Sequence, residues 1–512
     1  MKINYIKSTL FAGLTWLSFN LTQAQNLELT WGNQTEKKNP GTTLGRVIFK
    51  DNNHYQFVLE PEAGINNNKY MSSYVLRNNL QHIAESTIDI PQKHKGKDMG
   101  HWSSYNINGK IISFLSSFDQ KTETITLYCL AIDENGKVVN EILVDELVLN
   151  GKNDSRNFKI LYIENQKQFL ILHSAGASKN GKEELSLKLF KEDLSLAWER
   201  NVALPYSSKQ YDIISYQVDE ASNLFIYGNL SLDKKAIQKI VMAYDPQSQK
   251  LQEKIIPFGN ARSVSDVRFN YENGQLNFTG FYSNDKEATQ GVFFTQLNST
   301  TLNTTLEKLI PFSKSDMLKF TSEKSLQKEN GISENFDIRQ IIKKENGDIF
   351  ITAEVYKQKV IMNGSDREYV YNYDDIMIIG INKNLELKWM TKVNKLQFSD
   401  WISAKYNSFS TISDNQNLYI LYNDIEDNNS SNNKNGEWGN KKIETTYESK
   451  FVVTAATINL ENGELKREIV YKPAKKEKPL FVPKYSSNLT DNQLLIYAER
   501  YNIYKFGVFS IK

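Results

Sequence analysis

The segment "KHKGKDMGH" at residues 93–101 holds the one closely spaced pair among the five His residues of the chain. Imidazole and carboxylate groups from His94, Asp98 and His101 could together bind zinc or another divalent cation. The spacing matches no compact metal motif, and the lysines interleaved with these residues would repel a cation. We therefore expect no cofactor and no metal site, and keep these residues only as weak metal-ligand candidates.

Two tryptophans, Trp102 in "GHWSSY" and Trp401 in "SDWISAKY", each stand just before a segment with the pattern of a strand. If these strands line a central channel, exposed aromatic rings at its mouth would suit a sugar ring or an apolar side chain of a partner. Packing between adjacent sheets is the more ordinary alternative. Trp102, Trp401 and His101 are candidates for partner binding.

Two further segments, "SDVRF" and "FDIRQ", each place an acidic residue two positions before an arginine. Strand alternation predicts that Asp266 and Arg268 share one side of a strand, as do Asp337 and Arg339. Such residues could form a charged lining able to hold an anion. The alternative is that each pair satisfies itself, as buried charges must. Arg268 and Arg339 complete the set of binding candidates.

A basic segment near the C-terminus could contact anionic lipid or an acidic partner, which would allow peripheral association with a membrane. A solvated loop is the safer interpretation. The segment contains Lys472, Lys475, Lys476, Lys478, Phe481 and Lys484.

Motifs that would assign a reaction are absent from the sequence. It contains no G-x-S-x-G elbow, no phosphate-binding glycine loop and no H-E-x-x-H. The lone Cys129 lies in the apolar run "ITLYCLAI", where a buried hydrophobe is expected rather than a nucleophile. No catalytic residue is assigned, and a non-enzymatic role is favoured.

Residues 1–24 have the basic start, apolar run and small-residue cleavage site of a secretory signal peptide. The apolar run is shorter than the roughly 18 residues needed to span a bilayer, and no later stretch approaches that length. The 62 basic and 60 acidic residues are spread without a dominant block, so the chain lacks the basic face of a nucleic-acid-binding protein. The sequence predicts an exported protein of the periplasm or outer cell envelope.

Eight segments share one design, in which an Asn, Asp or Gly turn precedes a run of alternating apolar and polar residues. Such turns predict β-hairpins. Each hairpin is flanked by further strand-like segments, and four antiparallel strands repeated at this interval are typical of a β-propeller. We predict an all-β fold with a single propeller domain at 25–512 and eight four-stranded blades, with seven as the alternative. The marker asparagines are Asn52, Asn108, Asn165, Asn223, Asn273, Asn346, Asn415 and Asn492.

The strand "NLELTW" at residues 26–31 nearly repeats "NLELKW" at 384–389, which has the position of an outermost, fourth strand. The first copy precedes any blade of its own, whereas the C-terminal residues supply three strands of a blade. The N-terminal strand is therefore predicted to complete the C-terminal blade and close the ring, which would leave no open sheet edge.

Long loop insertions are predicted at 313–334, 359–372 and 424–447, and nearly all long connections lie on one face of the propeller. Elaborated loops on one face of a rigid repeat commonly mark a binding face. Tolerated, solvated insertions are the alternative.

The strand design across 25–512 resembles the β-propeller superfamily, and the "LxLxW" outer strands are similar to those of exported bacterial propellers. The eight-bladed scaffold of the outer-membrane protein assembly machinery is similar in outline, although this chain lacks a lipid-anchoring Cys. The resemblance covers fold only, and it implies no functional residues. We expect a binding or scaffold propeller that recognises an envelope protein or glycan, as a monomer or within a hetero-complex. The alternative is a glycan-directed hydrolase or lyase with its site at the channel mouth.

Overall fold

The computed structural model describes most of the chain, and the predicted signal peptide lies outside the described residues. The described residues are 27–36, 42–50, 54–61, 72–77, 88–91, 93–133, 135–151, 154–177, 181–232, 237–284, 288–363, 366–429, 441–446, 450–474 and 479–512.

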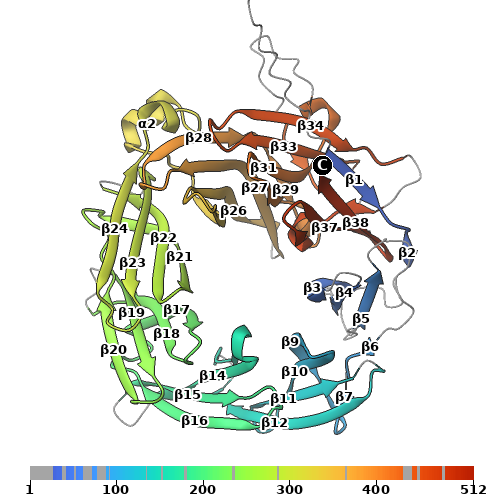
Figure 1. Ribbon diagram of the computed structural model, residues 1–512, viewed down its shortest axis with the longest axis vertical. Coiled ribbons are helices and arrows are strands. Elements are labelled where there is room, and N and C mark those ends of the chain that lie inside the picture. Colours follow the sequence, from blue (N-terminus) through green and yellow to red (C-terminus); the bar gives the residue numbers. More distant parts are fainter. Residues whose placement is uncertain are drawn as a thin grey trace, which may run out of the picture.

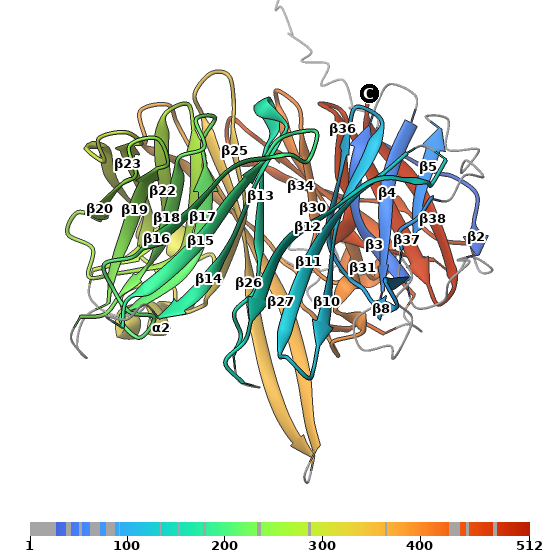
Figure 2. The same cartoon turned by 90° about the horizontal axis from the view of Figure 1, so that it is seen from below.

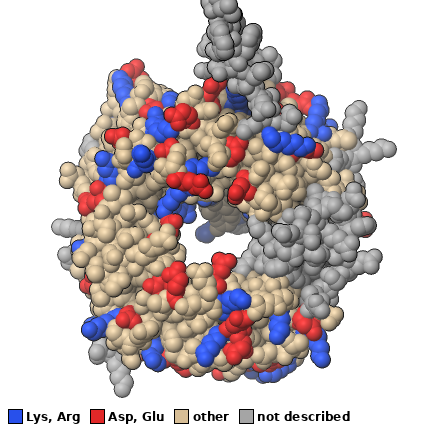
Figure 3. Space-filling view, viewed as in Figure 1, with Lys and Arg blue, Asp and Glu red and all other residues tan. Residues whose placement is uncertain are grey.

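Strands make up nearly all of the regular structure in these residues. They form eight sheets of at least four strands, whose ladders are antiparallel apart from one short parallel pairing. Figure 1 shows the sheets arranged in a ring, and Figure 3 shows that the molecule is hollowed at the centre of this ring. The fold is an all-β β-propeller, as the sequence predicted.

Five of the sheets have four strands each, taken in chain order. Their strands are β3 (Thr42–Lys50), β4 (His54–Pro61), β5 (Ser72–Arg77) and β6 (Ile88–Asp89); β9 (Gly100–Ile107), β10 (Lys110–Asp119), β11 (Thr124–Ile132) and β12 (Val138–Val148); β13 (Lys159–Ile163), β14 (Gln168–Ala177), β15 (Glu183–Phe190) and β16 (Leu196–Ala203); β17 (Tyr211–Val218), β18 (Leu224–Leu230), β19 (Gln238–Asp245) and β20 (Lys250–Ile255); and β21 (Ser263–Glu272), β22 (Gln275–Ser283), β23 (Gly291–Asn298) and β24 (Thr304–Pro311).

Of the remaining three sheets, two have six strands, and the third has four strands that are not all consecutive in the chain. Their strands are β25 (Phe336–Lys343), β26 (Ile349–Asn363), β27 (Asp366–Ile381) and β28 (Leu387–Val393), with β29 (Gln397–Ser399) and β32 (Ile443–Glu444); β30 (Ser410–Ser413), β31 (Asn417–Asp424), β33 (Val452–Asn459) and β34 (Leu465–Tyr471); and β1 (Leu27–Trp31), β38 (Ile503–Ile511), β37 (Gln493–Arg500), β35 (Leu480–Phe481), β36 (Ser487–Thr490) and β2 (Thr35–Glu36). A small separate hairpin is formed by β7 (Lys93–His94) and β8 (Lys97–Asp98).

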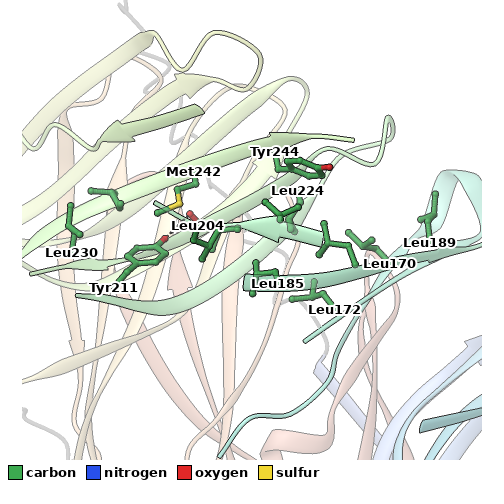
Figure 4. Packing of buried hydrophobic residues seen from close by; sticks show 14 of the residues in the cluster. Leu170, Leu172, Leu185, Leu189, Leu204, Tyr211, Leu224, Leu230, Met242 and Tyr244 are labelled. Carbon is green, nitrogen blue, oxygen red and sulfur yellow. Dashed lines mark hydrogen bonds between the residues drawn. The ribbon is translucent and has the colours of Figure 1, made fainter. Parts of the chain in front are cut away.

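The hydrophobic core is divided into clusters, several of which lie between neighbouring sheets. In one cluster, Leu170 and Leu185 from the β13–β16 sheet pack with Leu224 and Met242 from the β17–β20 sheet (Figure 4). The second and third strands of a sheet are largely buried because they have a neighbouring sheet on each side. Outermost strands such as β20 are at most half-buried. Each blade therefore depends on its neighbours for burial.

The N-terminal strand β1 pairs antiparallel with β38 over its whole length. In this ladder Trp31 lies opposite Gly507, and in the sheet of β28 Trp389 lies opposite Gly380. A Cβ atom on Gly507 would lie 2.7 Å from the Trp31 ring, and one on Gly380 would lie 2.5 Å from the Trp389 ring, so both rings rest on a bare backbone. Leu29–Trp31 and Leu387–Trp389 are thus used in the same way in an outer strand, whereas 384–386 belong to the turn before β28.

The segment 359–372 is not a loop, as the sequence had suggested, but the far part of a long hairpin. Strands β26 and β27 pair continuously out to Asn363 and Asp366. Figure 2 shows this hairpin projecting well beyond the other strands. The segment contains Val360, Ile361, Tyr369, Val370 and Tyr371, and residues of these types favour extended strands over coil.

The other two insertions contain short helices. The 313–334 insertion forms α1 (Lys314–Met317) and α2 (Glu323–Glu329), whose first turns are capped by the Ser313 and Ser322 side chains. The 424–447 insertion contains the 3-10 helix η3 (Glu426–Asn429) and strand β32, while 430–440 lies outside the described residues. Three further 3-10 helices are η1 (Glu164–Gln166), η2 (Ser403–Tyr406) and η4 (Pro483–Tyr485). No helix in the described part of the chain is long and apolar enough to cross a membrane.

Candidate functional site

The long hairpin has two distinct ends, which we name the tip and the foot. The tip is the ribbon of residues 357–363 and 366–372, beyond the part of β26 that pairs with β25. The foot is the cluster of Arg339, Glu354, Tyr373, Lys395 and Lys484, which gathers where the hairpin leaves its sheet.

The tip presents apolar side chains to solvent. Val360, Ile361 and Met362 are 51%, 44% and 57% exposed, and Tyr369 opposite Val360 is 37% exposed. Among the described residues, the outer edge of β26 from Tyr356 to Asn363 pairs with no second strand. An exposed apolar ribbon with a free edge costs solubility and invites association, so proteins usually avoid it unless it binds something.

The foot begins with a β-bulge in β25. The register between β25 and β26 shifts between Ile338 and Gln340, so Arg339 is the extra residue in the ladder. Bulges turn a side chain away from its regular direction. The Arg339 guanidinium is thereby brought to Glu354 on β26, with 2.8 Å between Nη2 and Oε2, and it lies about 6 Å from the rings of Tyr356 and Tyr373.

Glu354 is the anion at the centre of the foot. Its side chain is fully buried, and Oε1 lies 2.8 Å from the Nζ atom of Lys395, which is itself 1% exposed. The hydroxyl of Ser408 also donates to Oε2 at 2.7 Å. Burial by itself would raise the pKa of Glu354, but the charges of Lys395 and Arg339 outweigh it and hold the pKa below its ordinary value. Both oxygens of Glu354 are therefore held by cations or a hydroxyl, and the carboxylate is ionised at neutral pH.

Lys484 approaches the same cluster from η4. Its Nζ atom donates to the Tyr373 hydroxyl at 2.8 Å and to the Ala404 carbonyl at 3.2 Å, and it lies 4.2 Å from the centre of the Tyr373 ring. The residue is exposed to solvent, and neighbouring protein atoms partly desolvate its ammonium group. Burial lowers the pKa of Lys484 to about 8, and the nearby charges of Arg339 and Lys395 add to this effect against the opposing charge of Glu354.

The sequence had placed Lys484 in a basic loop with Phe481, and the structure separates these residues. Phe481 is 3% exposed and packs in the core, while Lys472 pairs with Glu426. Residues 475–478, which include the other lysines of that segment, lie outside the described residues.

The structure brings the two predicted arginines together. Arg268 on β21 and Arg339 on β25 line one cavity of about 470 Å³ between adjacent sheets. Arg268 lies 3.2 Å from Asp266, whose carboxylate also accepts a hydrogen bond from the Ile338 amide in the next sheet. Asp337 lies 3.9 Å from Arg339. The simple two-residue alternation predicted for these pairs is interrupted by the bulges in both strands.

The two candidate tryptophans have different surroundings. Trp102 lies on β9, half-buried, with its ring edge-on to Phe158 at 6.4 Å. Trp401 follows β29 and is 44% exposed. Exposure leaves Trp401 available to a partner, whereas Trp102 packs between sheets.

The three weak metal-ligand candidates have separate contacts. His94 lies 2.9 Å from the Glu141 carboxylate and edge-on to the Tyr128 ring. Nε2 of His101 lies 2.7 Å from the Ser104 hydroxyl, and Asp98 lies on β8. In the part of the chain that the structure describes, no three His, Cys, Asp or Glu residues gather in an arrangement that could hold a metal ion.

A polar cavity of about 1140 Å³ lies among the short turns of three sheets. Asn346, Asn415 and Asn492, three of the turn markers in the sequence, contribute to its lining. Lys344 is anchored there by hydrogen bonds of 2.8 Å to Ser413 and to the Asp414 carbonyl.

Sequence reasoning overlooked most of the foot and the tip. Glu354 interrupts the apolar run "DIFITAEVY", and a charge in a buried strand signals a buried ion pair. Lys395 and Tyr373 are brought to it by tertiary contacts alone, so no local pattern marks them.

Comparison with known proteins supports only a general likeness of fold. No family model and no curated protein matches the chain. Among solved structures, Sqt1 from Saccharomyces cerevisiae is similar over 95% of this chain and 100% of its own, with 10% identity and a TM-score of 0.39. The β-propeller domain of the Trilobed protease from Pyrococcus furiosus is similar over 70% of this chain and 96% of its own, with 8% identity and a TM-score of 0.32. A DUF4221 family member from Bacteroides vulgatus covers 95% of this chain and 99% of its own, with 12% identity and a TM-score of 0.28. None of these similarities is close enough to suggest a function.

Proposed function

We propose that the chain is a non-enzymatic binding or scaffold propeller of the bacterial cell envelope, which docks a partner protein through the tip of the β26–β27 hairpin. The observation that carries the proposal is the exposure of Val360, Ile361 and Met362 at the end of a projecting ribbon. The ion pairs of Glu354 with Arg339 and Lys395 support a structural role for the foot rather than an acid–base centre.

A protein partner fits the tip better than a glycan. Sugars are bound by flat aromatic faces and by polar groups that match hydroxyls. Three of the four large hydrophobic residues exposed at the tip are instead aliphatic or Met, the fourth being Tyr369. A partner with an apolar groove would cover these side chains, and its backbone could pair with the free edge of β26. Trp401 would offer a secondary contact.

The proposal includes a closed ring of eight blades, in which β1 completes the C-terminal blade. Pairing of Thr30 with Val508 supports this closure. Replacement of both by Cys, in a chain with Cys129→Ala, should give an intramolecular disulfide, because paired antiparallel residues have Cα atoms about 5 Å apart. Cysteines at Thr30 and Ser510 are out of register and serve as the control. Equal disulfide formation in both would contradict the closure.

Export is the other part of the proposal, and the signal-like residues 1–24 support it. A fusion of these residues to a reporter enzyme active only outside the cytoplasm should be active. An inactive but stable fusion would contradict export.

Capture from envelope extracts tests the docking function. The bait is the chain from residue 25, and the test variant carries Val360→Ser, Ile361→Ser and Met362→Ser. The control carries Ser at Leu318 and Phe118, which are also exposed apolar residues but lie away from the hairpin. One protein should be enriched by the wild type and the control and be lost from the tip variant. Equal recovery by the tip variant would overturn the proposal, and tip-dependent binding to protein-free lipid vesicles would replace it with a membrane contact.

A further inference from the structure

The foot of the hairpin brings three cations together, and one of them has no carboxylate partner among the described residues. Arg339, Lys395 and Lys484 converge on it, and the fully ionised anion among them is Glu354, which is already shared by Arg339 and Lys395. Asp337 lies at the edge of the cluster, and burial raises its pKa, which weakens its value as a counter-charge. Asp374 and Asp424 interact with Lys395, and burial raises the pKa of both. Within the described residues, none of these carboxyls forms an ion pair with Lys484.

Lys484 is the cation that this arrangement affects most. Among the described residues, its recorded partners are a phenol and a carbonyl, which are both neutral. Among the described residues, the charged groups that act on it are Arg339 from β25, Glu354 from β26 and Lys395 from the β28–β29 connection. Tyr373 on β27 and a backbone carbonyl from η2 also face it. An ammonium in this position is destabilised until an anion joins it.

We propose that Lys484 and Arg339 form the two arms of a binding site for an oxyanion, such as the carboxylate, sulfate or phosphate group of a ligand. Arg339 is 30% exposed and Lys484 is exposed, so both can be reached from solvent. The two cations lie against the same ring, that of Tyr373, at about 6 Å and 4.2 Å from its centre. The Tyr373 hydroxyl, bonded to Lys484, holds the ammonium in place.

The site is independent of the docking tip. It rests on the foot alone, and it concerns a small anionic group rather than an apolar protein surface. The tip variant should therefore bind the anion as the wild type does, so failure of one proposal leaves the other standing.

Isothermal titration with sodium sulfate, phosphate and acetate at constant ionic strength tests the site. At pH 7 we expect saturable binding of at least one of the three anions, and the preferred anion identifies the group. Lys484→Met should weaken this binding at least tenfold, because it removes a charged arm and keeps the length of the side chain. Lys343→Met is the matched control, since Lys343 lies on β25, as Arg339 does, but pairs with Glu272 away from the foot.

The pH dependence gives a second readout, and sulfate is used because its own charge is constant. Binding should weaken as the pH rises through about 8, where Lys484 loses its proton. At pH 8 binding should take up protons, which appears as a dependence of the heat on the buffer. Equal sulfate affinity in Lys484→Met and wild type, absence of saturable binding of all three anions, or an affinity unchanged between pH 7 and 9.5 would overturn the proposal.

Discussion

The two ends of the β26–β27 hairpin reverse the usual rule of protein structure. At the tip, apolar side chains such as Ile361 and Met362 are exposed, and at the foot the charged Glu354 and Lys395 are almost wholly buried. Folding stability alone favours the opposite arrangement, with apolar groups inside and charges outside. The contrast teaches that the exposed end is available for association, while the buried end rigidly fixes the direction in which the hairpin projects.

The foot is expected to respond most strongly to substitution. Glu354→Gln leaves Arg339 and Lys395 without their shared counter-charge, and breaking a buried pair in this way costs about 3–5 kcal/mol of unfolding free energy. Chemical denaturation at pH 7 would measure the loss. Glu272→Gln is the control, because Glu272 and Lys343 form an exposed pair, whose removal should cost less than about 1 kcal/mol.

The effect of Glu354→Gln on stability should depend on pH. The pKa of Glu354 is lowered by folding, so its contribution to stability is present above the unfolded-state pKa of about 4.3 and is lost as the pH falls through the folded-state pKa. The stability difference between wild type and Glu354→Gln should therefore shrink below about pH 4. If the difference in unfolding free energy stayed constant at low pH, Glu354 would stabilise the fold through side-chain packing rather than through its charge.

Lys484→Met is expected to have a smaller effect of opposite sign. The folded protein lowers the pKa of Lys484 to about 8, so the charged form opposes folding below that pH, and wild-type stability recovers as the pH rises from 8 towards the unfolded-state value. The variant should be more stable than wild type at pH 7, by less than about 1 kcal/mol because the residue is exposed. The gain should vanish above about pH 10. Destabilisation at pH 7 would contradict this view of the foot.

The tip should show the smallest effect on stability. Serine at Val360, Ile361 and Met362 removes no buried contact, so the unfolding free energy should change by at most about 0.5 kcal/mol. Thermal unfolding beside the wild type would measure it. A loss of several kcal/mol would mean that the tip packs against the protein itself and is not available to a partner.

The sequence predicted the propeller well because its signals are local and repeated. Turns marked by asparagine, followed by alternating apolar and polar residues, predict each hairpin. The shared "LELxW" pattern identified the strand that pairs with β38. The hairpin was taken for a loop because its length exceeds that of a normal blade strand. The foot was missed because Glu354, Lys395 and Lys484 are far apart in the sequence and meet only through the packing of different blades.

Photo-crosslinking from the tip tests the docking role most directly. A photoreactive amino acid replaces Ile361 in the full chain, and a second version carries it at Leu318, which is also exposed but lies in the α1 region. After irradiation of intact cells, the version with the probe at 361 should give one dominant crosslinked protein, and the version at 318 should not. No crosslink from 361, or the same products from both positions, would contradict the claim that the hairpin tip is the docking element.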